Sequence, residues 1–178
     1  MKNTQHTYGK PSKILHYLAA IFVPMLLIAG AIMKQLPHNL SALGAIYNIH
    51  KLSGLAILCL MLVFFTWSMS QTKPIYPHTM ATWEKLLAKF VQYGLYLTVI
   101  AMATSGWFMS SAAHHPPHLF HYTFQLPLAK NKELAKQLAR IHFVLAWTIT
   151  LLLSLHIAGA VKHHFINKND TVRRMWRW

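Results

Sequence analysis

Residues 141–161 read IHFVLAWTITLLLSLHIAGAV and contain no charged side chain. A helix of this length would cross the roughly 30 Å hydrocarbon core of a membrane. The stretch also holds two histidines, His142 near its start and His156 near its end. An ionisable residue inside a membrane span is costly unless something binds it, so such residues usually have a function. The segment therefore predicts a membrane helix with a functional site toward each end.

Three more uncharged runs precede this segment, at residues 14–33, 52–69 and 90–109. The chain of 178 residues is 54% hydrophobic and only 11% charged, which is typical of a membrane protein. We therefore predict an all-α fold, an integral membrane four-helix bundle. Its spans are expected at about residues 14–33, 50–69, 89–110 and 138–162.

In this prediction a single transmembrane domain, residues 13–162, lies between two cytoplasmic tails. Residues 1–12 form a polar tail that we expect to be mobile, and residues 163–178 form a basic tail. The first run contains Pro24 and no small-residue cleavage site of the Ala-x-Ala kind, so we expect it to be retained as a helix. The charged stretch from Lys130 to Arg140 is expected to extend the fourth helix.

The formal net charge of +14 has two explanations, nucleic-acid binding and membrane topology. The 17 Lys and Arg residues lie in short loops and tails beside the apolar runs, which argues against a nucleic-acid surface. Three precede the first run, three lie between the second and third, and five follow the fourth, eleven in all. Because cytoplasmic loops carry the excess of Lys and Arg, we predict that the N- and C-termini are both cytoplasmic.

The chain has one cysteine, Cys59, which falls within the second apolar run. A single cysteine permits neither a disulfide nor a Cys-ligated iron–sulfur cluster within one chain. Redox chemistry carried by an iron–sulfur cluster would therefore need a partner protein.

Four histidines lie near the ends of the predicted spans. His142 and His156 are 14 residues apart, which on a helix is about 21 Å and about four turns, so they share a face at opposite depths. His16 lies near the cytoplasmic end of the first span and His50 near the outer end of the second. The natural pairs are then His16 with His156 and His50 with His142.

Neutral imidazole is a good axial ligand for haem iron. Two such pairs at two depths predict two six-coordinate bis-histidine haems and electron transfer across the bilayer. Small residues near the pairs would let a flat macrocycle or another helix approach closely, although glycine is also common in packed membrane helices. These residues are Gly30, Gly54, Gly106 and Gly159.

Other interpretations remain open. The histidines could simply hydrogen-bond neighbouring helices, or they could relay protons in a transporter, although Glu84, Glu133 and Asp170 all fall outside the apolar runs. A zinc site is disfavoured, because no pair has His-x3-His spacing and the four histidines cannot converge on one ion. The histidine-rich loop at residues 114–121 could bind a metal or relay protons, but such loops are usually only solvated.

The chain resembles the bacterial cytochrome b561 family of four-helix, di-haem membrane proteins over roughly residues 11 to 175. The resemblance rests on five short motifs, which are specific only together. They are KILHY (13–17), IHKLSG (49–54), IHFVLA (141–146), SLHIAGA (154–160) and HHFINKNDTVRRM (163–175).

The resemblance implies that His16, His50, His142 and His156 are the axial ligands of two haem b groups. It also implies a multi-pass protein of the bacterial inner membrane that exchanges electrons with ubiquinone. The best-understood members resemble superoxide oxidases, in which superoxide outside the membrane is the electron donor.

An open cationic outer surface would draw superoxide toward the outer haem. Lys51, beside His50, and Arg140, two residues before His142, are the candidate residues. Lys34 and Lys136 could face the same space. Each of these cations could equally serve only to anchor a helix end at the lipid headgroups.

A quinone site beside the inner haem would need donors for the carbonyl oxygens. Lys85, Lys89 and Gln92, together with Lys13, lie at a suitable depth, although each could be an ordinary interfacial residue. The family often has histidines early in the third helix, where this chain has Lys89 and Gln92. Details of this pocket therefore cannot be copied from relatives.

The histidine pairs favour electron transfer, and the resemblance implies an enzyme, an oxidoreductase that passes electrons from an outer donor, superoxide, to ubiquinone. The alternative is a cytochrome b anchor subunit that wires a partner dehydrogenase or hydrogenase to the quinone pool. The two differ in whether the chain alone reduces quinone with superoxide. The sequence leaves open whether the chain forms a homodimer.

Overall fold

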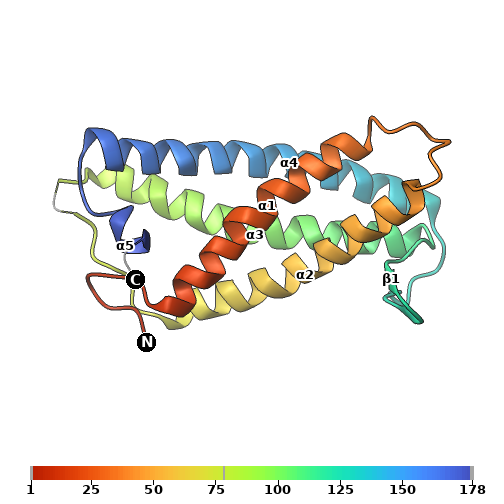
Figure 1. Ribbon diagram of the computed structural model, residues 1–178, viewed down its shortest axis with the longest axis horizontal. Helices are drawn as coiled ribbons and strands as arrows, with labels where there is room; N and C mark the ends of the chain where they lie inside the picture. The colour runs from red at the N-terminus through yellow and green to blue at the C-terminus, as the bar shows by residue number, and fades with distance from the viewer. Residues whose placement is uncertain (1, 78, 177–178) are drawn as a thin grey trace.

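The computed structural model describes residues 2–77 and 79–176. Four long helices dominate it (Figure 1): α1 (Lys10–Met33), α2 (Leu43–Ser70), α3 (Thr82–Ala112) and α4 (Lys132–Val161). A π-helical turn, η1 (Lys162–Ile166), continues α4, and the short helix α5 (Arg173–Trp176) follows. Two short strands, β1 (His118–Leu119) and β2 (Tyr122–Thr123), pair antiparallel in the connection between α3 and α4.

All four long helices are long and apolar enough to span a membrane, which confirms the predicted four-helix membrane bundle. The helices extend beyond the apolar runs. In α4 the side chain of Asn131 accepts a hydrogen bond from the Leu134 N–H at 2.9 Å and so caps the helix where the charged stretch begins. The predicted extension of the fourth helix is therefore confirmed, whereas the depths at which the membrane begins and ends stay predictions.

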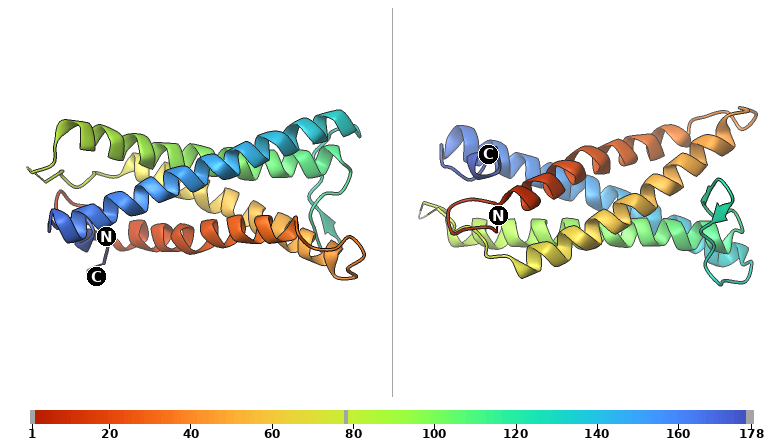
Figure 2. Two further views of the ribbon diagram at one scale, coloured as in Figure 1. Left: turned by 90° about the horizontal axis from the view of Figure 1, so that it is seen from above. Right: turned by 60° about the horizontal axis from the view of Figure 1, so that its bottom comes forward.

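Successive helices pack as antiparallel neighbours, α1 on α2, α2 on α3 and α3 on α4. In the described part of the chain, α1 and α4 are not among the closely packed pairs. Figure 2 shows both termini at the same end of the bundle, as an even number of crossings requires. That this end is cytoplasmic remains a prediction from the charge distribution.

An apolar core fills the middle of the bundle. It is built from six buried side chains of α2, α3 and α4, namely Ile57, Met61, Phe64, Tyr96, Val99 and Ile149. Ile149 is only 1% exposed and lies midway between His142 and His156 on α4. The core therefore separates the two histidine levels with a layer that excludes water.

The N-terminal tail makes hydrogen bonds to itself and to the rest of the chain, whereas its mobility stays a prediction. The side-chain oxygen of Asn3 accepts hydrogen bonds from the Gly9 N–H at 2.9 Å and from the Ser12 hydroxyl at 2.7 Å. The Ile75 N–H donates to the Gln5 carbonyl at 3.0 Å, which ties the tail to the connection between α2 and α3. Gln5 and Ile75 are 70 residues apart, which is why composition alone did not reveal this contact.

Candidate functional site

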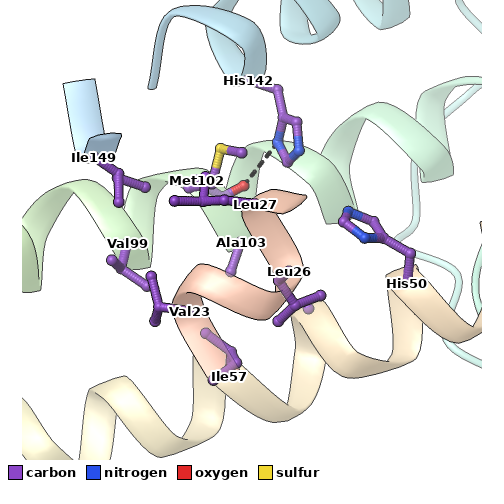
Figure 3. A pocket seen from close by; sticks show the side chains of 11 residues that line it. Val23, Leu26, Leu27, His50, Ile57, Val99, Met102, Ala103, His142 and Ile149 are labelled. Carbon is purple, nitrogen blue, oxygen red and sulfur yellow. Dashed lines mark hydrogen bonds between the residues drawn. The ribbon is translucent and has the colours of Figure 1, made fainter. Parts of the chain in front are cut away.

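His50 and His142 lie at one end of an apolar cavity between the helices. His50 comes from α2 and His142 from α4, and Figure 3 shows both rings directed toward the space between them. The cavity has about 420 Å³ of empty space, its open side included. The rest of its wall is almost entirely apolar: Val23, Leu26, Leu27, Gly54, Ile57, Val99, Met102, Ala103 and Ile149. The structure thus brings together the two histidines that were expected to form the outer pair.

The hydrogen bonds of His142 decide which of its nitrogens is free to bind a metal. Its Nδ1 atom lies 3.0 Å from the Met102 carbonyl oxygen and 3.1 Å from the Ser105 hydroxyl. Because a carbonyl oxygen can only accept, Nδ1 carries the proton and Nε2 keeps its lone pair. Histidines that ligate a metal usually donate their other ring N–H in this way. His142 is therefore prepared as a neutral Nε2 ligand.

A glycine from a neighbouring helix backs each of these two rings. A Cβ atom on Gly30 of α1 would lie 3.5 Å from Cε1 of His50, and one on Gly106 of α3 would lie 2.9 Å from Cε1 of His142. The second distance is shorter than real contacts allow, so any larger residue at Gly106 would push the ring. A Cβ on Gly54 or Gly159 would meet nothing within 4 Å, which leaves room beside both histidine levels.

His16 of α1 and His156 of α4 form the second pair. Their ring centroids are 6.2 Å apart and the ring planes meet at 50°. The two imidazoles are therefore close enough for both to be ligands of one group held between them. The structure therefore brings together all four predicted histidines in the two expected pairs.

The environment of the histidines also fits a haem group. Nδ1 of His16 and Nδ1 of His50 are both buried, and neither has a hydrogen-bond partner among the described residues. Buried polar atoms are rarely left in this state. No cluster of three or more His, Cys, Asp or Glu side chains that could hold a bare metal ion occurs in the described chain. Facing imidazoles beside an apolar space suit haem iron better than a free ion.

A four-helix membrane bundle with facing histidines between its helices defines the class of membrane b-type cytochromes. The sequence model described as Prokaryotic cytochrome b561 matches residues 7–178, and the chain belongs to this family. Family membership makes the protein a haem b-binding electron-transfer protein and an oxidoreductase. Together with the four spanning helices it also confirms a multi-pass protein of the bacterial inner membrane.

Two curated relatives cover nearly the whole chain. Cytochrome b561 homolog 2 of Escherichia coli (strain K12) is 30% identical over 175 residues, which cover 97% of this chain and 93% of that protein. Cytochrome b561 homolog 1 of the same organism is 21% identical over 168 residues, 94% of this chain and 96% of that protein. Both agree with the family resemblance found in the short motifs.

The cations predicted for the outer surface have different surroundings. The Lys51 ammonium group donates to the His115 carbonyl at 2.6 Å. The Lys34 ammonium nitrogen lies 3.9 Å from the centre of the Phe143 ring. Phe143 follows His142 in the sequence. Arg140 is exposed and, two residues before His142, lies about 200° around the helix from it. Lys51 and Lys34 are thus near the outer pair, while Arg140 stays a prediction without a contact to support it.

Three of the four residues predicted for the quinone site, Lys85, Lys89 and Gln92, lie toward the start of α3. Lys85 is partly buried, whereas Lys89 is exposed. Gln92 is partly buried. Lys13 of α1 is buried, with 3% of its surface exposed. A quinone role for any of these four remains a prediction.

Sequence reasoning missed two features of the site. Ser105 and the Met102 carbonyl orient His142, and a serine or a backbone carbonyl in an apolar helix has no sequence pattern that reveals this role. The second is the burial of His163, which follows the fourth apolar run and is 8% exposed. Its Nδ1 lies 3.3 Å and 3.2 Å from the amide groups of Asn167 and Asn169, which belong to the same C-terminal segment.

Proposed function

We propose that the protein is a di-haem b oxidoreductase that carries single electrons across the inner membrane, from superoxide at the outer side to ubiquinone. The observation that supports this most strongly is the pairing of four histidines at two levels, His50 with His142 and His16 with His156. Each pair has one member on α4, and these two residues, His142 and His156, are 14 positions apart. A single site for substrate chemistry would not need histidine pairs at two depths of the bundle.

The two histidine pairs would hold the haem b groups, which when bound would supply one-electron carriers. The chain itself has three tasks. The hydrogen bonds from Nδ1 of His142 to Met102 and Ser105 hold one ligand in place. The glycines behind the rings leave room for close packing, and Ile149 with the rest of the core keeps water away from the space between the levels. This arrangement favours electron transfer over oxygen activation.

The positive charge of Lys51 is proposed to attract the superoxide anion. Its ammonium group follows His50 in the chain and is held by the His115 carbonyl. Lys51→Gln removes one positive charge, so the second-order rate constant for superoxide should fall, on the order of threefold, and should depend less on ionic strength. Pulse radiolysis of the purified protein at several salt concentrations measures both quantities.

The control for this experiment is Lys130→Gln, which makes the same charge change at an exposed residue of the connection between α3 and α4. Its rate constant should stay close to that of the unaltered protein, and both variants should keep their haem. An equal fall in the two variants would mean that only net charge matters and that Lys51 has no special position.

The electron acceptor is proposed to be ubiquinone, bound beside the inner pair where Lys85, Lys89 and Gln92 lie along α3. Membrane-dissolved quinone would reach this end of the bundle from the surrounding lipid. The support is the early position of these residues in α3, at the end of the bundle that also carries His16 near the start of α1.

The deciding experiment has two stages. Haem content per chain is measured first, by pyridine haemochrome and a reduced-minus-oxidised spectrum of the solubilised protein, and we expect two low-spin b haems. Superoxide-driven reduction of a soluble ubiquinone analogue is measured next. One haem or none would contradict the di-haem proposal. Two haems without quinone reduction would instead favour the anchor subunit that wires a partner dehydrogenase or hydrogenase to quinone.

A further inference from the structure

The small hairpin between α3 and α4 displays apolar side chains that touch little of the protein. Leu119 is 47% exposed, Phe120 88% and Tyr122 75%. They lie within or between β1 and β2, whose register pairs Leu119 with Tyr122. A hairpin tip in water would normally carry polar turn residues, so this composition requires an explanation.

Hydrogen bonds hold the hairpin in the conformation that exposes these side chains. The Phe124 N–H donates to the Pro117 carbonyl at 2.9 Å and closes the base of the hairpin, and the Trp107 indole donates to the Phe124 carbonyl at 2.7 Å. Phe120 itself has a φ of 51°, in the left-handed region that an aromatic residue rarely adopts. The tip is therefore held in a costly conformation with its ring directed away from the chain.

The depth of the hairpin follows from its contacts with α2. The Asn48 side chain donates to the His118 carbonyl at 2.8 Å and accepts from the His118 N–H at 2.9 Å. Lys51 donates to the His115 carbonyl at 2.6 Å. Asn48 and Lys51, the residues of α2 that make these contacts, lie within about 3 Å of His50 along the helix axis. The hairpin thus lies beside the outer histidine level, as its position alongside the start of α2 in Figure 1 also shows.

Neighbouring residues of α2 at the same level are also apolar and exposed. Tyr47 is 37% exposed and Ile49 63%. They flank Asn48, the residue that clamps the hairpin. The hairpin therefore continues the apolar surface of a membrane-spanning helix instead of standing alone in water.

We propose that Leu119, Phe120 and Tyr122 insert into the lipid headgroup interface at the His50 end of the bundle, and so anchor the loop that holds Lys51. Aromatic side chains favour this region of a bilayer, where an apolar ring can be buried beside polar headgroups. The segment from Ala113 to Lys132 has no acidic residue that would repel anionic lipids. Membrane lipid is the partner because the depth set by Asn48 places the tip at this interface.

The test places an environment-sensitive fluorophore at the tip. Phe120→Cys is made in a chain that also carries Cys59→Ala, because Cys59 is a free exposed thiol, and the new thiol is labelled with nitrobenzoxadiazole. The holoprotein is reconstituted at high dilution in vesicles of phosphatidylethanolamine and phosphatidylglycerol. The matched control is Lys130→Cys in the same background, at an exposed polar position of the same connection.

At position 120 we expect blue-shifted emission, quenching by lipid with a nitroxide near its headgroup, and at least threefold weaker quenching by aqueous iodide than at position 130. Equal iodide quenching at the two positions would overturn the proposal. A blue shift that disappears when protein is diluted further into lipid would also overturn it, because the partner would then be a second copy of the chain. The readout does not depend on superoxide or quinone turnover.

Discussion

Replacing His142 with alanine is expected to lower the haem content from two b haems per chain to one, with the inner haem unaffected. The reason is that His142 is the member of the outer pair whose ring is oriented by the chain, through hydrogen bonds of 3.0 Å to Met102 and 3.1 Å to Ser105. His156→Ala should have the converse effect and remove the inner haem. Pyridine haemochrome measures the number lost, and redox titration of the visible bands shows which component remains.

Two controls separate loss of a ligand from loss of the fold. His121→Ala removes an exposed imidazole from the hairpin and should leave both haems in place. Imidazole added to His142→Ala should enter the space left by the side chain and restore a low-spin spectrum, whereas a misfolded protein would not respond. If both alanine variants kept two haems, or if either lost both, the assignment of the ligand pairs would be wrong.

The pairing of these histidines could be predicted because helical geometry links sequence to depth. Two residues separated by 14 positions on one helix must share a face, so His142 and His156 required partners at two levels. Length and hydropathy determined the four helices in the same direct way, and the charged stretch from Lys130 was expected to extend the fourth, which begins at Lys132. These features depend on residues close together in the chain.

The features that could not be predicted depend on contacts between residues far apart in sequence. Asn48 and His118 are 70 residues apart, and nothing local in either segment indicates that the hairpin is clamped to α2. The packed N-terminal tail is a similar case, since its partners lie in the connection between α2 and α3. Ser105 in turn gains its role only because α3 packs against α4 at that point. The pattern of residues within one segment contains no information on how that segment packs against distant ones.

Gly106→Ala is expected to disrupt the outer haem although it adds only one methyl group. The added Cβ would lie 2.9 Å from Cε1 and 3.3 Å from Nδ1 of His142. An imidazole ring is rigid, so it would have to move as a whole, and movement would break the Nδ1 hydrogen bond to the Met102 carbonyl. We expect the outer haem to be lost, or to be held at least tenfold more weakly, with the inner haem unchanged.

Gly30→Ala is the matched control, because its Cβ would approach His50 only to 3.5 Å, an ordinary contact. Both substitutions replace glycine by alanine within a long helix, where alanine is favoured by about 1 kcal/mol. Helix propensity therefore cannot explain a loss seen only at position 106. Haem content after detergent washing and the low-spin spectrum measure the effect. Two intact haems in Gly106→Ala would mean that the His142 ring does not lie against α3 as described, and equal losses in the two variants would point to a general sensitivity of the helices to added volume.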